Sequence, residues 1–207
     1  MIKKVKMKRH ESFSIREGWL TKGIKAVKQN SKVFSSADAT DVLGIGTNMV
    51  KSLKYWMLAT GLVKDSNREI VLSDLGVLIE KYDPYLEDIF SWWIIHITLT
   101  INLEDAYVYN LFFNKCLMKN FSKLDIYEKI SSLLIENKIE YNENTLHDEI
   151  NMIIKTYSLD EKIDNPENNF ICPLSELGLL KKVDVNLYER TKPEQRKLNF
   201  LVMYYLT

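Results

Sequence analysis

Hydrophobic residues recur at the three- and four-residue spacing of a helix in three short stretches near the start of the chain. The first stretch runs from Trp19 to Asn30, the second over residues 37–43, and the third from Asn48 to Thr60. Leu43-Gly44-Ile45-Gly46 separates the second from the third, and its glycines permit the positive φ angles of a tight turn. Two short helices joined by a glycine turn are typical of a helix-turn-helix, whose second helix enters the major groove of DNA.

A pair of short apolar segments follows the third predicted helix. Leu62-Val63 and residues 70–72 bracket the polar stretch 64–69, a pattern that predicts a hairpin with a solvent-exposed tip. Another helical pattern begins at Ser73, as often happens directly after such a hairpin. We therefore expect a winged helix-turn-helix within residues 1–82.

Residues 83–207 are expected to form a second, helical region. Helical patterns cover 85–101, 105–118, 124–137 and 145–157, and they precede a loop at 164–169, a short helix near 173–180 and a strand from Val183 to Tyr188. The apolar run from Ile89 to Ile101 spans about 13 residues, which predicts a buried helix that is too short to cross a bilayer. The expected fold is mainly α, with the winged helix first. The apolar segment 197–207 either docks as a terminal helix or continues into a longer natural chain.

Charge separates the same two regions. The 28 basic and 28 acidic side chains cancel overall, yet residues 1–72 hold 14 basic against 6 acidic ones and the remainder holds 14 against 22. A basic region attracts polyanions and gains affinity by releasing counterions from a phosphate backbone. The alternative is that the cations of residues 3–9 form a solvated arm and the rest are ordinary surface residues.

Two features indicate a cytoplasmic protein of a reducing compartment. Cys116 and Cys172 have no second cysteine or histidine at the spacing of a zinc site, so we expect buried free thiols. The basic N-terminus is not followed by the apolar segment of a secretion signal. We expect neither a cofactor nor a metal to be needed for stability, and no membrane partner.

Candidate DNA contacts lie on the third helix and the hairpin. The cations that we expect to bind phosphate are Lys51, Lys54, Lys64 and Arg68. Ser52 and Tyr55 are the candidates for contacts with base edges, although an aromatic residue in a helix is about equally often part of the core.

The sequence contains only weak matches to catalytic motifs. Asp125, Glu136 and Lys138 have the D-x-E-x-K order of metal-dependent nucleases, but they lie in a helical pattern instead of on a strand pair, so chance is favoured. Acidic residues within 83–88 could bind a cation, although they also suit a helix N-terminus. His96 is more often a core histidine than a metal ligand in such a setting.

Several blocks of sequence resemble one bacterial family of unknown function. The blocks are His10-Glu11-Ser12-Phe13 with Arg16 and Trp19, Leu43 to Val50 with Ser52 and Trp56, Asp83 to Asp88 with Trp93 and His96, and Leu111-Phe112-Phe113-Asn114. Together they resemble the bacterial domain-of-unknown-function family number four-thousand-and-seven. The family-motif positions that we single out are His10, Glu11, Arg16, Asn48, Asp88 and His96.

The resemblance implies a role in DNA backbone modification or phage defence. Members are typically encoded beside the sulfur-transfer genes of DNA phosphorothioation systems, and the nicking subunit of the single-strand type is similar. It implies a subunit that binds double-stranded DNA and acts together with other subunits of the system. A second, weaker hypothesis is that the subunit nicks a DNA strand in the presence of Mg²⁺. Arg9 and Thr47 depart from the family pattern, and relatives are longer, which implies a missing C-terminal part. The rivals are a winged-helix transcriptional regulator and a non-catalytic scaffold that docks a protein.

Overall fold

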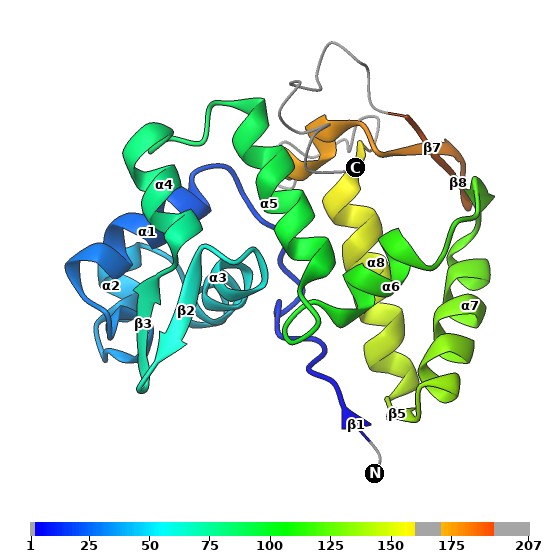
Figure 1. The fold of residues 1–207 in the computed structure, drawn as a ribbon, viewed down its shortest axis with the longest axis horizontal. Helices are drawn as coiled ribbons and strands as arrows, with labels where there is room; N and C mark the ends of the chain where they lie inside the picture. Colours follow the sequence, from blue (N-terminus) through cyan, green and yellow to red (C-terminus); the bar gives the residue numbers. More distant parts are fainter. Residues whose placement is uncertain (1–2, 160–170, 193–207) are drawn as a thin grey trace.

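The computed structural model describes residues 3–159 and 171–192. Most of this part of the chain is helical, as the sequence predicts. Figure 1 shows helices α1 to α4 and a hairpin gathered on one side of the molecule, and helices α5 to α8 with a small sheet on the other. The N-terminal segment runs between the two groups.

The predicted helices of the first region are present within two residues of their expected bounds. They are α1 (Trp19–Gln29), α2 (Ala39–Leu43) and α3 (Thr47–Ala59), with a short 3-10 helix η1 (Val33–Ser35) before α2. Ser14, which the sequence offers as a plausible cap of the first helix, does not cap it. Gly18, with a φ of 72°, precedes α1, and Ser14 is buried.

The predicted hairpin is also present. Strands β2 (Val63–Ser66) and β3 (Glu69–Leu72) are antiparallel and pair Ser66 with Glu69. Asn67 and Arg68 form the two-residue turn, and both have positive φ, 52° and 70°. This is the geometry of a type I′ turn, whose twist matches that of the flanking strands. Helix α4 (Asp74–Tyr82) follows directly.

Four helices build the second region. These are α5 (Ile89–Ile101), α6 (Tyr107–Asn114), α7 (Lys123–Glu136) and α8 (Glu143–Tyr157). Helix α6 is shorter than the predicted 105–118, because the N–H groups of Lys115 and Cys116 both turn back to the Leu111 carbonyl and end it. Helix α7 begins with a capping box between Ser122 and Asp125.

A small sheet closes the far end of this region. Its order is β4-β8-β7-β6, formed by Asn120–Phe121, Leu187–Arg190, Leu180–Asp184 and Ser158–Leu159, and the 3-10 helix η3 (Pro173–Leu177) precedes β7. The prediction of one strand over 183–188 was wrong. The chain reverses at residues 185–186, where the Asp184 carboxylate accepts the Val185 N–H. The predicted loop 164–169 and the segment 197–207 lie outside the described residues.

The N-terminal segment and one further strand complete the secondary structure of the described residues. Strand β1 (Lys3–Lys4) pairs in parallel with β5 (Ile139–Glu140). None of the described helices is long and apolar enough to span a bilayer.

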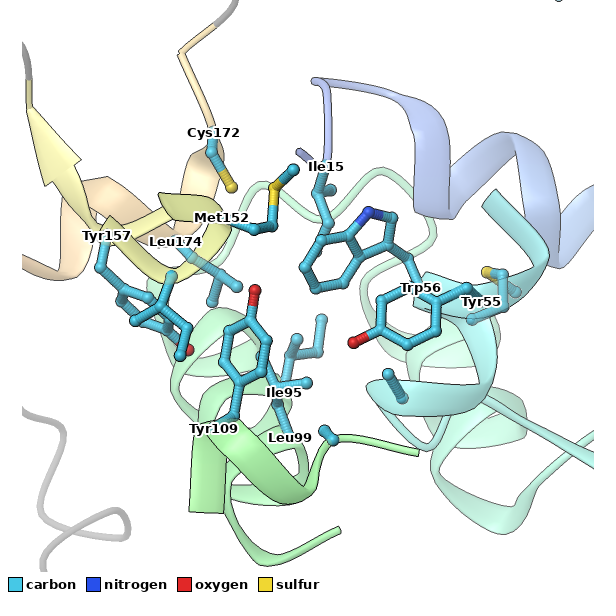
Figure 2. Packing of buried hydrophobic residues seen from close by; sticks show 14 of the residues in the cluster. Ile15, Tyr55, Trp56, Ile95, Leu99, Tyr109, Met152, Tyr157, Cys172 and Leu174 are labelled. Atoms are coloured by element: carbon cyan, nitrogen blue, oxygen red, sulfur yellow. The ribbon is translucent and has the colours of Figure 1, made fainter. Parts of the chain in front are cut away.

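One continuous hydrophobic core joins the two regions. Figure 2 shows Trp56 and Ile15 of the first region facing Ile95, Tyr109 and Met152 of the second. Trp56, Ile95 and Tyr109 have no exposed surface. Cys116 and Cys172 are buried free thiols, as the sequence predicts. The domain boundary after residue 82 stays a prediction.

Gly76 is required by close packing between α4 and the end of α3. A Cβ atom at this position would lie 2.0 Å from the carbonyl oxygen of Leu62. We expect Gly76→Ala to lower the free energy of unfolding by about 1–3 kcal/mol, because the backbone of residue 62 must shift. Gly46→Ala is the control, since a Cβ there would meet nothing within 4 Å. Equal urea midpoints for the two variants would contradict the expectation.

Candidate nucleic-acid interface

The solvent-facing stripe of α3 is narrow and partly basic. Thr47, Lys51, Lys54 and Leu58 lie within about 60° of each other around the helix. Thr47 and Lys51 are exposed, and Lys54 and Leu58 are half-buried. The opposite face, which includes Trp56, packs in the core. The predicted cations on α3 are therefore at the surface.

Ser52 and Tyr55 do not belong to this surface, which corrects the prediction that they reach base edges. Ser52 is fully buried, and its hydroxyl donates to the carbonyl oxygen of Phe13 at 3.3 Å. Tyr55 is 5% exposed and lies edge-on to the ring of His10, with 6.0 Å between ring centres. The N-terminal segment covers this side of α3, and the periodicity of the helix alone does not contain that information.

The other predicted contacts lie on the exposed hairpin and at the start of α3. Lys64 and Arg68 are exposed, on β2 and at the turn. Asn48 is exposed as well, and its side-chain oxygen lies 3.4 Å from Nζ of Lys51. Among the described residues, none of the four predicted phosphate-binding cations forms an ion pair with an acidic side chain.

Other cations of the basic region form ion pairs with acidic side chains of the same chain. Ion pairs join Lys28 to Glu80 at 2.7 Å and Lys32 to Glu69 at 3.3 Å. The arm also contributes: Lys6 contacts two acids that follow α5, and Lys8 contacts Asp148 of α8. The positive excess of residues 1–72 is therefore not one continuous surface, and four of its cations that form no ion pair within the described residues lie on α3 and the hairpin.

The motif residue His10 belongs to a buried polar contact between the regions. Its Nδ1 accepts the Ser12 N–H at 3.2 Å, and its Nε2 lies 3.5 Å from Oε1 of Glu149. The same carboxylate oxygen accepts the backbone N–H of Lys8. His10 and Glu149 are 1% and 3% exposed. Sequence reasoning missed Glu149, although an acid on the apolar face of a predicted helix was a visible signal.

Two further motif residues, Arg16 and Glu11, lie on the same N-terminal segment as His10. Arg16 is half-buried, with its guanidinium over the rings of Phe13 and Trp19, 5.6 and 5.4 Å from their centres. Glu11 is half-buried in a left-handed conformation, with a φ of 47°. These residues shape the path of the N-terminal segment on its way into α1.

Asp88 and His96 serve the second region. Asp88 caps α5 by accepting the Phe90 N–H at 2.8 Å, and Asp83 accepts the N–H groups of residues 87 and 88. These acids therefore bind backbone groups. Nδ1 of His96 lies 2.8 Å from the hydroxyl of Tyr157, and burial lowers the pKa of His96 to about 3. It is a core histidine in this structure.

The D-x-E-x-K residues do not converge. Asp125 is in the first turn of α7, Glu136 ends that helix about 16 Å further along its axis, and Lys138 is exposed in the turn beyond it. Across the described ranges, no group of three His, Cys, Asp or Glu side chains is arranged to hold a metal ion. No catalytic metal centre is assigned to these residues.

Arg68 occupies a conformation that favours glycine. A left-handed φ strains a residue with a long side chain by roughly 1–2 kcal/mol. We expect Arg68→Gly to raise the free energy of unfolding by about 0.5–1 kcal/mol, since part of the relief is lost to the greater entropy of the unfolded chain. Lys64→Gly, on the extended strand of the same hairpin, should instead lower it. Urea unfolding of both variants checks this, and destabilisation by Arg68→Gly would contradict it.

The lowered pKa of the half-buried His96 predicts a pH dependence of stability. Its pKa is about 3 in the folded protein against 6.5 ordinarily, so the unfolded state binds its proton more tightly. The contribution is complete above pH 6.5 and is lost as the pH falls from 6.5 toward 3, at up to about 1.4 kcal/mol per pH unit. His96→Gln should show a shallower loss than the wild type in urea unfolding between about pH 7 and 5. An ordinary His96 pKa in an NMR titration would overturn the expectation.

Comparison with solved structures gives two close matches in fold. A "Magnesium ion-bound SspB crystal structure" matches with a TM-score of 0.86 and 25% sequence identity, and an "SspB crystal structure" matches with a TM-score of 0.80 and 25% identity. Each match covers 96% of this chain and 63% of the SspB chain. The protein therefore spans less than two thirds of the length of the SspB chains that it resembles.

The chain was also compared with known families and with curated proteins. No curated protein matches the chain. The model of one family, described as "Protein of unknown function (DUF4007)", matches residues 7–207. The chain therefore belongs to the DUF4007 family, in agreement with the resemblance carried by its sequence blocks.

Proposed function

We propose that the protein binds double-stranded DNA through a winged helix formed by α1 to α3 and the hairpin β2–β3. The observation that carries the proposal is a set of four surface cations on α3 and the hairpin, Lys51, Lys54, Lys64 and Arg68. Lys54 is half-buried and the other three are exposed, and none of them forms an ion pair with an acid within the described residues. Such cations release counterions from the phosphate backbone on binding and so favour a polyanion.

The arrangement of the elements supports this proposal. Helix α2 is followed by a turn in which Gly44 has a φ of 59°, and α3 then starts at Thr47. The side chains that a major groove would meet first are those of the exposed N-terminal turn of α3, Thr47, Asn48 and Lys51. Thr47 and Asn48 replace Ser52 and Tyr55 as the proposed base-reading positions, and Lys51 stays a phosphate contact.

The strain at Arg68 supports a role for the hairpin turn as a wing. Glycine is favoured at a left-handed turn position on stability alone. A basic side chain there, exposed at the end of two strands, suits a contact with the backbone of a neighbouring groove. Local strain of this kind is often found where function sets the residue.

The family resemblance supplies the biological context of the proposal. We infer that the chain is the DNA-engaging part of a DNA phosphorothioation or phage-defence system, in which other subunits carry out the modification. The likeness to SspB extends over 63% of that chain, and the rest of the SspB chain lies outside the match.

Nicking is not part of the proposal for the described residues. One of the similar SspB structures is described as magnesium-bound, but no set of three carboxylate, histidine or thiol groups converges within residues 3–159 and 171–192. Two of the acids that could bind a cation, Asp83 and Asp88, accept backbone N–H groups, in line with the favoured interpretation of this cluster as part of a helix N-terminus. A nicking gel with supercoiled plasmid and Mg²⁺ tests that separate hypothesis directly.

The double substitution Lys51→Ala with Lys54→Ala tests DNA binding. We expect weaker binding to duplexes of every sequence and a salt slope, d log K/d log[salt], that is flatter by about 2, because two phosphate contacts are lost. Fluorescence anisotropy with a labelled duplex at several salt concentrations measures both. The matched control is Lys129→Ala with Lys181→Ala, which removes two exposed cations from α7 and β7.

The same titration separates the rival functions. A transcriptional regulator would prefer one operator sequence, whereas a modification subunit should bind many duplexes with similar affinity. A scaffold that docks only proteins would have no salt-sensitive affinity for DNA. That last result, or an unchanged slope in the Lys51/Lys54 variant, would reject the proposed interface.

A further inference from the structure

The N-terminal strap, defined as residues 6–13, lies directly against α3. The carbonyl oxygen of Phe13 accepts hydrogen bonds from Nε1 of Trp56 at 2.8 Å and from the Ser52 hydroxyl at 3.3 Å. Three residues before Phe13, the ring of His10 contacts the ring of Tyr55. The strap therefore follows the side of α3 on which Ser52, Tyr55 and Trp56 lie. In Figure 1 it descends along one side of α3, and the hairpin β2–β3 lies on the other.

A buried contact and the backbone angles of the strap fix its path. The backbone N–H of Lys8 and the imidazole of His10 converge on the buried carboxylate of Glu149. Lys8, Glu11 and Ser12 all have positive φ, 55°, 47° and 65°, so the backbone changes direction on both sides of residues 9 and 10. This path turns His10 into the interior and leaves Arg9 exposed.

Arg9 differs from its basic neighbours in having no acidic partner in the described part of the chain. Nζ of Lys6 lies 2.7 Å from Glu104 and 2.9 Å from Asp105, and Nζ of Lys8 lies 2.6 Å from Asp148. The Lys6 and Lys8 ammonium groups hold the strap to the second region. The Arg9 guanidinium is exposed and remains available to an external anion.

The charge of Arg9 acts on α3 itself. Burial raises the pKa of Tyr55 well above its usual 10.0, and the Arg9 charge partly opposes that rise. Arg9 also contributes, after Lys6, to the lowered pKa of Glu104. Tyr55 lies about 40° around α3 from Lys51. The ring of His10, the residue after Arg9, lies against Tyr55, so the backbone of Arg9 is close to the side of α3 that borders Lys51.

We propose that Arg9 is a phosphate-binding residue of a composite DNA surface in which the strap flanks α3 on one side and the hairpin flanks it on the other. The inference rests on the proposed function. An arginine presents up to five N–H donors in a rigid fork that fits phosphate oxygens, and a fixed backbone reduces the entropy lost on binding. Arg9 is 42 residues from Lys51 in the sequence, and the fold brings them to one face.

Arg9→Ala in the full chain tests the inference. We expect the affinity for a labelled duplex of mixed sequence to fall about threefold to tenfold at low salt, and the salt slope to flatten by about 1. Arg9→Lys keeps the charge and should restore most of the slope. Lys129→Ala removes one exposed cation from α7 and should leave affinity and slope unchanged. Thermal unfolding of each variant establishes that it is folded.

The outcomes separate this inference from the proposed function. Loss of one unit of slope in Arg9→Ala, with rescue by Arg9→Lys, supports the composite surface. If the wild type binds DNA with a salt-dependent affinity and Arg9→Ala binds equally well, the inference is wrong and the proposed function stands. If Arg9→Ala changes only the unfolding temperature, Arg9 has a structural role and the inference is also wrong. If the wild type does not bind DNA, both fail.

Discussion

The fold depends on one buried carboxylate. Glu149 projects from α8 into the interior, where an ionised group without partners is strongly unfavourable. The backbone of Lys8 and the ring of His10 supply those partners from the other end of the chain. The N-terminal strap thus supplies the groups that lie against the buried acid of α8. The Phe13 carbonyl of the strap accepts a hydrogen bond from Trp56 of α3. The strap therefore links the buried acid of one region to a helix of the other.

This coupling explains why the basic region is not uniformly basic at its surface. Cations close to acids of the second region form ion pairs there, and Lys6 and Lys8 are the examples. Cations on α3 and the hairpin have no such neighbours and stay exposed. The net charge of the whole chain is zero, yet some of its charges are paired between the regions and others are unpaired on separate surfaces. A polyanion would interact mainly with the unpaired ones.

The secondary structure was largely predictable because its signals are local. Apolar spacing located α1, α3 and α8, and the polar interruption at 64–69 located the hairpin β2–β3. The failures occurred where a distant segment decides the outcome. The expected strand at 183–188 is a turn between two strands, and those strands pair with β4 and β6. Hydrogen-bond partners of this kind are far away in the sequence and leave no periodic pattern.

For the candidate site, the residues alone determined which cations are present, which helix and hairpin carry them, and which family the motifs resemble. The tertiary structure decided which of those side chains face solvent. It buried Ser52 and Tyr55 under the strap, paired Lys6 and Lys8 with acids, and left Arg9 beside α3. The physical reason is that burial and ion pairing depend on every group within a few ångströms, and the carboxylate that receives Lys8 and His10 is more than a hundred residues away along the chain.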